Sequence, residues 1–365
     1  MKTEIDAKKV TAGIVFLLGL ILTVVIYFTP SSYCNTGVII NHDLADKVTD
    51  KVTDEYKNSD VKRVQTLKIK ILSGKERGKI YQIKNHYVAS QIQTQKYRSG
   101  QRVLVSFNHG TIKLESPKRD WVIFLGLSIA SALLILVCGK RTIWLAVSLL
   151  LNWIIFYLVI FFDVKENGTE IFTIYGAAVI IFAFCSLLLG QGFNRKMLIT
   201  FLVTLLGVFV SFGICYAVMI LTGENGMKYE TVEYATQNPR SLFLAQALLG
   251  VLGAVMDEAT DIVSSLYELC QRKPTLKAQE LLLSGRSMGQ EIMGPLINVL
   301  VLIFMAEALP MTILYLRDNN TLRFTFEFTL SLGMIQSLMS AIGICLTAVF
   351  ASVASLTFLH SKEAK

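Results

Sequence analysis

The sequence predicts an α-helical polytopic membrane protein of about eight spans, with a small extracytoplasmic β-rich, OB-like domain between the first two spans. Hydrophobic residues make up 53% of the 365 positions and charged residues only 17%. Apolar runs of about 20 residues recur along the chain, and each is long enough to cross ~30 Å of hydrocarbon. Between the first two runs lies a long polar interval with short β-branched segments, which is typical of a small sheet.

The apolar runs follow one another from the N-terminus. The first, with its core from Ala12 to Phe28, is interpreted as an uncleaved anchor because no small-residue cleavage pattern follows before Pro30. The last run is longer than a bilayer requires, so we expect it to tilt, kink or project beyond the membrane. The predicted spans cover residues 11–29, 121–138, 143–162, 171–190, 198–221, 242–268, 292–316 and 325–358.

These spans give three predicted domains. Residues 1–29 form a cytoplasmic N-terminus and first anchor, residues 30–119 the extracytoplasmic domain, and residues 120–365 a seven-helix transmembrane domain with a cytoplasmic C-terminus. The orientation rests on Lys and Arg, which gather in cytoplasmic loops. Thirteen of them flank the spans on the side of both termini, against five in the short loops and flanks of the other side.

The predicted outer domain carries the positive charge of the whole chain. Residues 30–119 contain 17 Lys and Arg against 8 Asp and Glu, a balance of +9, while the rest of the chain balances to −1. This charge favours attraction to anionic lipid headgroups or wall polymers, and the alternative is a basic surface that serves only solubility. Residues 41–63 are polar and are expected to be a tether or loop. Short strands are predicted at residues 64–72, 79–84, 102–107 and 111–115, which fit a small barrel or OB-like sheet.

The sixth predicted span carries an acidic stripe. This apolar segment contains Asp257, Glu258 and Asp261, and a carboxylate in hydrocarbon costs several kcal/mol. At 100° per residue, Asp257 and Asp261 share one face with Gly250 and Gly253, while Glu258 points to the side. Small residues above acids on one face leave room for a neighbouring helix, water or an ion.

The two following spans each show a polar face as well. Glu291, Gly294 and Asn298 align on the seventh span, and Gln336 and Ser340 align on the eighth. Each acid also has a simpler interpretation as an interfacial charge, and each amide or hydroxyl as a hydrogen bond between helices. The predicted pathway residues are Asp257, Asp261, Glu291, Asn298, Gln336 and Ser340, and the predicted packing glycines are Gly250, Gly253 and Gly294.

The cytoplasmic link between the sixth and seventh spans contains a short amphipathic stretch. Residues 276–283 show apolar and charged positions at helical spacing, and Ser284 and Gly285 end the pattern. We expect a short helix here, either interfacial or simply connecting, before the seventh span.

Most familiar catalytic and cofactor motifs are missing from the sequence. It holds no phosphate-binding Gly-x-x-x-x-Gly-Lys-Ser/Thr and no His-Glu-x-x-His pattern. Gly285–Gly289 has the letters Gly-x-Ser-x-Gly, but this segment is short and wrongly placed for phosphate binding, and it is not taken as a catalytic motif. The six cysteines and four histidines show no metal-ligand spacing. We therefore predict a protein that is not an enzyme, with no catalytic residue, no cofactor and no nucleic-acid partner, and the sequence leaves a metal site undetermined.

Several segments resemble the YibE/F-like family of bacterial multi-pass membrane proteins. The resembling segments are Ile71–Lys79, Ser99–Val105, Gly253–Glu268, Gly285–Gly294, Asn298 and Leu309–Pro310. The resemblance implies a location in the bacterial plasma membrane and a second, similar membrane subunit as a partner. The chain has Glu291 and Pro295 where the family usually has Asp and Thr, and Glu307 where a small residue is expected. Pro295 removes a backbone N–H, so it alters the hydrogen bonding around the predicted site.

These observations lead to one preferred function and two alternatives. We expect a transporter or channel for a small cation or a proton-coupled solute, because three adjacent spans present polar faces near Asp257. The main alternative is a non-catalytic scaffold or sensor that presents the basic outer domain, as a subunit of a two-component membrane complex. An intramembrane aspartyl protease is disfavoured because its Tyr-Asp and Gly-x-Gly-Asp signatures are missing. The partners expected are the lipid bilayer and the small cation or solute.

Overall fold

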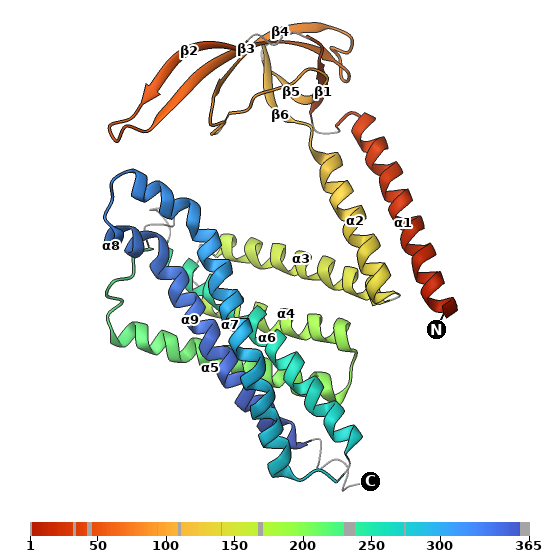
Figure 1. Ribbon diagram of the computed structural model, residues 1–365, viewed down its shortest axis with the longest axis vertical. Helices are drawn as coiled ribbons and strands as arrows, with labels where there is room; N and C mark the ends of the chain where they lie inside the picture. The colour runs from red at the N-terminus through yellow and green to blue at the C-terminus, as the bar shows by residue number, and fades with distance from the viewer. Residues whose placement is uncertain are drawn as a thin grey trace. The chain divides into compact units, whose positions relative to one another are not determined.

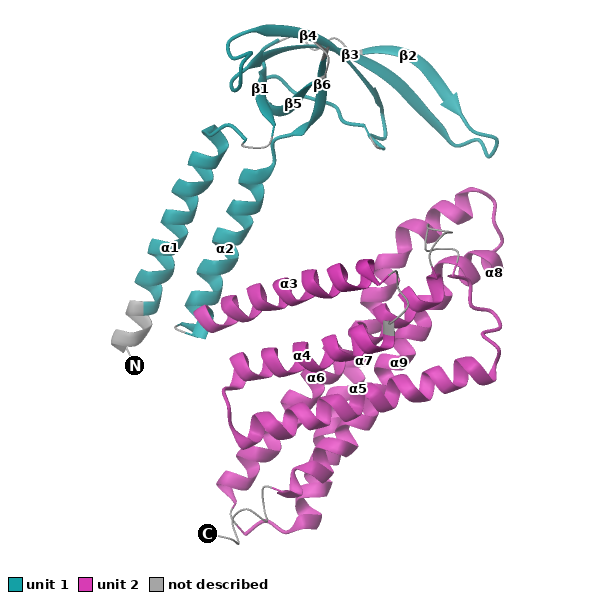
Figure 2. Ribbon diagram, turned by 180° about the vertical axis from the view of Figure 1, so that it is seen from behind, with its two compact units in different colours: residues 1–142 teal, residues 143–365 magenta. Residues whose placement is uncertain are grey.

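The computed structural model describes residues 2–31, 34–41, 46–92, 94–108, 111–139, 141–166, 171–229, 238–273 and 275–357. The chain forms two compact units, Met1–Thr142 and Ile143–Lys365 (Figure 2). Within these described ranges, eight helical segments are long and apolar enough to cross a membrane, which confirms the predicted number of candidate spans by length and composition. The first unit also holds a small curled β-sheet near the N-terminus (Figure 1).

Two long helices of the first unit pack side by side. They are α1 (Lys2–Phe28) and α2 (Asp120–Cys138), on either side of the sheet segment in the sequence. Gly19 faces α2 so closely that an added Cβ would overlap the side chain of Ser128. Such close approach at small residues is typical of apolar helices that associate in a membrane, where lipid tails supply little driving force.

The sheet of the first unit is antiparallel in every described pairing. Its longest strand, β3, pairs with β4 along one edge and with β2 and then β1 along the other. One strand thus serves two neighbours on the same edge, and the strand order continues from β1 to β5 and β6. The strands are β1 (Asn35–Ile39), β2 (Asp46–Thr53), β3 (Ser59–Ile71), β4 (Ile80–Val88), β5 (Arg102–Asn108) and β6 (Thr111–Pro117).

The core of the sheet follows from the alternation of its strands. Successive side chains of a strand point to opposite faces, so one face can bury apolar residues while the other stays polar. The buried Gln65 belongs to the inner face, where its side chain bonds the backbone N–H and C=O of Tyr97 at 3.1 and 3.2 Å. The buried hydrophobic residues are Ile39, Leu67, Ile69, Ile71, Tyr97, Val103 and Val105.

The expectation of a tether over residues 41–63 is wrong for much of that range. β2 pairs with the first half of β3, and Asp54 closes the turn between them by accepting bonds from Tyr56 N at 3.0 Å and Asn58 N at 2.8 Å. Val48 and Val52 of β2 are exposed, so no buried face marks the strand in the sequence. A hairpin that is solvated on both faces lacks the alternation by which strands are recognised.

The second unit consists of helices packed around α6. The apolar window of α6 is 61% buried, the largest share among the eight candidate spans, because α4, α5, α7 and α9 all contact this helix (Figure 1). Asn238 begins α6 by accepting a bond from Ser241 N, with Pro239 at the first helical position, which is a favourable start for a helix. The long helices of this unit are α3 (Arg141–Lys165), α4 (Ile171–Gln191), α5 (Arg195–Leu221), α6 (Pro239–Arg272), α7 (Ala278–Arg317) and α9 (Ser331–Ala354).

Two helices depart from the shapes predicted for them. The amphipathic stretch before the seventh span is continuous with α7. Gly285 lies inside this helix and packs against α6 and α9, where an added Cβ would overlap Ser352 and lie close to Leu266. Gly285 is therefore a packing residue and not a helix end. In the last span, α8 (Leu322–Thr325) and a π-helical turn at Phe326–Leu330, labelled η2, precede α9. A π-helical turn interrupts the regular ladder and is a recognised cause of helix kinks.

Candidate functional site

The acids of α6 lie on two different faces of the helix. Asp257 and Asp261 are exposed, as is the neighbouring Gly253. Glu258, which the helical pattern placed to the side, is 0% exposed. The interior carboxylate of this helix is therefore Glu258.

The predicted polar face of α7 is also exposed. Glu291, Gly294 and Asn298 all have exposed positions in the structure, and an added Cβ at Gly294 would meet nothing within 4 Å. The opposite face of α7 makes the contact with α9, where Gly289 comes so close that an added Cβ would lie 2.6 Å from the Cβ of Ala348. The structure thus does not bring Glu291 and Asn298 into the packed interior with Glu258.

The polar stripe of α9 lies against α6. Gln246 Nε2 of α6 donates to Gln336 Oε1 at 3.2 Å, and Gln336 also covers Gly250, where an added Cβ would overlap its amide. Ser340, one turn further along α9, is 4% exposed. At Gly253, by contrast, an added Cβ would meet nothing within 4 Å. Of the predicted residues, the structure brings together Gln336, Ser340 and Gly250.

Helices α5, α6 and α9 meet in a closely packed junction. An added Cβ at Gly207 of α5 would overlap Thr347 of α9 and lie 2.7 Å from Val255 of α6. At Gly343 of α9 it would lie 2.7 Å from Val255 and 3.1 Å from the hydroxyl of Ser211. Glycines on two of the three helices therefore allow the backbones to approach, and they leave no room for even one more methyl group.

Glu258 lies one turn beyond Val255, next to this junction. Both of its carboxylate oxygens are buried and have no hydrogen-bond partner among the described residues. Thr204 is fully buried one turn before Gly207 on the antiparallel α5, so the register of the helices brings it to the level of Glu258. An ionised carboxylate that is buried without a partner costs several kcal/mol, so Glu258 in this position requires a proton or a cation.

The buried hydroxyls around the junction each donate to a carbonyl oxygen of their own helix. Thr204 donates to Thr200 O at 2.8 Å, Thr347 to Gly343 O at 2.7 Å and Ser211 to Gly207 O at 2.7 Å. A hydroxyl that donates to its own helix still has lone pairs with which to accept a hydrogen bond from a neutral acid or to bind a cation. The junction and the turn beside it therefore hold one carboxylate and several hydroxyl oxygens in an otherwise apolar interior.

The spacing of large apolar residues in α6 indicated that Glu258 lies on the buried face of the helix. Val251, Val255 and Ile262 precede or follow it by seven, three and four residues, and all three are fully buried. Glu258 thus belongs to the stripe of large apolar residues, whereas Asp257 belongs to the stripe of small ones. Large apolar residues fill the packed face of a helix in this unit, so they were the better guide to its interior side.

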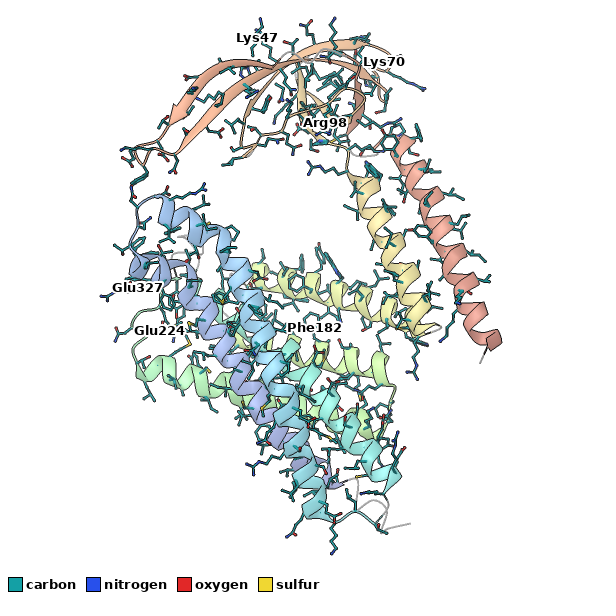
Figure 3. The ribbon with its side chains drawn as sticks, viewed as in Figure 1. Lys47, Lys70, Arg98, Phe182, Glu224 and Glu327 are labelled. Carbon is teal, nitrogen blue, oxygen red and sulfur yellow. The ribbon has the colours of Figure 1, made fainter. Side chains whose placement is uncertain are left out.

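A second polar cluster joins the ends of α5 and α6 that lie away from Glu258. Arg240 pairs with Glu224 at 2.6 Å, and the Tyr229 hydroxyl donates to Glu224 at 3.1 Å. Glu224 is labelled in Figure 3. Burial and this carboxylate raise the pKa of Tyr229 to about 12. In the part of the chain that the structure describes, no group of three or more His, Cys, Asp or Glu side chains is arranged to hold a metal ion.

Comparison with known proteins gives two matches to family models. The model described as YibE/F-like protein matches residues 127–361, and the YibE/F family N-terminal domain matches residues 35–116. Together they cover the sheet up to the next-to-last residue of β6, the first unit from residue 127 onward, and all of the second unit except its last four residues. No curated protein and no solved structure matches the chain.

Proposed function

The chain belongs to the YibE/F-like family, and on that premise we propose that it is a multi-pass transporter or channel of the bacterial cell membrane for a small cation or a proton-coupled solute. The eight apolar helices support membrane insertion. The excess of Lys and Arg on one side supports cytoplasmic termini and an extracytoplasmic, OB-like β-domain.

One observation carries the proposal, and it is the burial of Glu258 without a hydrogen-bond partner among the described residues. Acids inside membrane helices are rare because of their cost, and they usually mark proton or ion pathways. A scaffold gains nothing from such a residue, whereas a carrier uses it to bind a proton or cation reversibly.

The neighbouring acids supply a route to the buried carboxylate. Asp261 lies one turn from Glu258 toward the predicted cytoplasmic end, and side chains three residues apart on a helix are about 5–6 Å apart at Cβ. Both Asp257 and Asp261 are exposed, so they are placed to exchange a proton or cation between the surroundings and Glu258. On the other side, Ser340 and Gln336 continue the polar stripe along α9.

The packing of the junction favours a carrier that changes conformation and disfavours a permanently open pore. Gly207 and Gly343 bring the three helices together with no room for another methyl group. An ion that reaches Glu258 therefore needs α9 to shift against α5 and α6, and such helix movements are a recognised way of switching access.

A second candidate function is favoured by the exposed polar residues of α6 and α7. Asp257, Asp261, Glu291 and Asn298 face away from the packed interior, and polar groups cannot stay against lipid tails without cost. A second, similar membrane subunit that covers these faces would satisfy them. In that case the chain is a scaffold or sensor subunit of a two-component complex, and the basic β-domain carries the function.

The test is ion flux in liposomes that contain the purified chain. We expect Glu258→Gln to lower proton or cation flux by about tenfold or more. A tenfold change in rate corresponds to an activation free energy of ~1.4 kcal/mol, which is smaller than the free-energy cost of one buried charge. The matched control is Glu268→Gln, which makes the same change at an exposed position on the same helix, and its flux should stay near that of the wild type. Equal flux in all three proteins would refute a transport role for Glu258. Flux in none of them would favour the scaffold or the missing subunit.

A further inference from the structure

The sheet of the first unit has one face on which lysines follow two neighbouring strands. On β3, residues 62, 64, 66, 68 and 70 point to the same side, because side chains alternate along a strand. The β3–β4 register places Lys84 opposite Thr66 on this side. We define the basic face by its exposed lysines, Lys62, Lys68, Lys70 and Lys84.

The basic face is chemically distinct from the rest of the sheet. The other positions on this side of β3 and β4 are Asp60, Val64, Thr66, Ile80, Gln82, His86 and Val88, of which only Asp60, at the start of β3, is acidic. β2 extends the same side with Lys47 opposite Val64, and with one acid, Asp50, opposite Lys62 at the end of the ladder. Asp60 and Asp50 both lie at the Lys62 end of the ladder, so Lys68, Lys70 and Lys84 form a positive field at the other end, with no acid beside them on this side of β3 and β4.

The lysines of the basic face are not used in the structure of the sheet. Elsewhere in the first unit, Lys79 pairs with Glu76 at 2.6 Å and Lys113 with Glu115 at 3.8 Å. Among the described residues, no ion pair or hydrogen bond involves the ammonium groups of these four lysines, although the backbone N–H of Lys68 donates to Asn41 Oδ1. Cations clustered at one surface repel one another, so this arrangement destabilises the folded sheet slightly unless an anion binds there.

The basic face is turned away from the helices of its own unit. Lys47 and Lys70 lie on the side of the sheet opposite α1 and α2, whereas Arg98 lies on the side toward these helices (Figure 3). Since α1 and α2 are the candidate membrane spans of this unit, headgroups of the bilayer that they cross would lie on the other side of the sheet. The orientation thus favours a partner in the surrounding medium over the surface of the same membrane.

We propose that the basic face binds a linear polyanion with repeating phosphate groups, as a site separate from the transport function. Lysines two residues apart on a strand are about 6.7 Å apart, and neighbouring strands are about 4.8 Å apart. From Lys62 to Lys70 the face extends about 27 Å, which is long enough for several repeats of an extended polymer. A row of ammonium groups without acceptors between them suits an anion with charge along its length better than a single compact anion.

The experiment measures binding of fluorescent long-chain inorganic polyphosphate to the full chain in nanodiscs of zwitterionic lipid. The face variant combines Lys68→Gln, Lys70→Gln and Lys84→Gln. The control variant combines Lys51→Gln, Lys57→Gln and Arg98→Gln, which removes the same net charge at exposed positions outside the basic face. We expect the face variant to bind at least about tenfold more weakly and the control to stay within about twofold of the wild type, with wild-type affinity falling steeply as salt rises.

The possible results separate this proposal from its rivals. Equal weakening in both variants would mean that net charge alone attracts the polymer, and the proposed face would be wrong. No polyphosphate binding by the wild type would overturn it as well. A parallel assay with free vesicles of anionic lipid tests the headgroup alternative, because loss of vesicle binding in the face variant without any polyphosphate binding would assign the lysines to a membrane surface. Thermal unfolding of both variants checks that the sheet remains folded.

Discussion

Asp60 shows how a single side chain ties the ends of two strands together. Its carboxylate accepts bonds from the Ser90 hydroxyl at 2.5 Å, from Ser90 N at 3.3 Å and from Val61 N at 2.7 Å. These donors, the Ser90 hydroxyl first, hold the pKa of Asp60 below its usual value. The charged form is therefore the one that stabilises the fold.

Ser90→Ala should destabilise the β3–β4 ladder more at pH 7 than in acid, where Asp60 becomes protonated. The pKa of Asp60 is lower in the folded state than in the unfolded state, so its stabilisation is present above about pH 4 and is lost as the pH falls through the folded value. Amide hydrogen exchange of residues 80–92, corrected for intrinsic pH effects, measures this. Ser59→Ala, next to Asp60 on the exposed side of the strand, serves as the control. An equal increase in exchange at both pH values would contradict the assignment to Asp60.

At the scale of elements, glycine positions decide how closely the helices of the second unit approach. Gly207 and Gly213 are both on α5, but only Gly207 faces the junction with α6 and α9. An added Cβ there would overlap Thr347 and Val255, two β-branched side chains with little rotational freedom. At Gly213 an added Cβ would meet nothing within 4 Å.

Gly207→Ala should therefore lower stability, whereas Gly213→Ala should not. Overpacking a tight interior costs about 1–3 kcal/mol, so Gly207→Ala should unfold at lower temperature. Gly213→Ala should be neutral or more stable by up to about 1 kcal/mol, because alanine favours the helix over glycine. Thermal unfolding in detergent compares the two directly. If both variants matched the wild type, the junction would be looser than the structure indicates.

The elements of this chain differed in how well their sequences predicted them. Eight helical segments were predictable because length and apolarity are properties of each segment alone. The hairpin of β2 was missed because both of its faces are solvated and leave no apolar alternation. The burial of Glu258 could not be predicted from its own segment, because it depends on which neighbours cover α6. That helix has one stripe of small residues and one of large residues, and the sequence alone does not determine which stripe faces the interior.

At the scale of the whole molecule, the proposed topology makes a prediction for labelling. In a background in which the six native cysteines are replaced by alanine, Lys75→Cys in the turn after β3 should react with a membrane-impermeant maleimide on intact cells. Lys277→Cys, just before α7, should react only after the cells are permeabilised, because the positive-inside rule puts this loop in the cytoplasm. The reverse pattern would invert the topology, and labelling of both sites in intact cells would contradict it.

The attachment of the sheet to its two helices has a mechanical consequence. Lys118, at the end of β6, bonds the carbonyl oxygens of Ile26 and Thr29 at the end of α1, and Arg102 bonds Phe28 O at 2.9 Å. The sheet is thus attached to the end of α1 and, through the chain after β6, to the start of α2, and the Lys118 bonds connect these two attachments. A force applied to the sheet therefore acts on α1 and α2 together, so the two helices tilt as one rigid pair. One helix can move relative to the other only after the Lys118 bonds break.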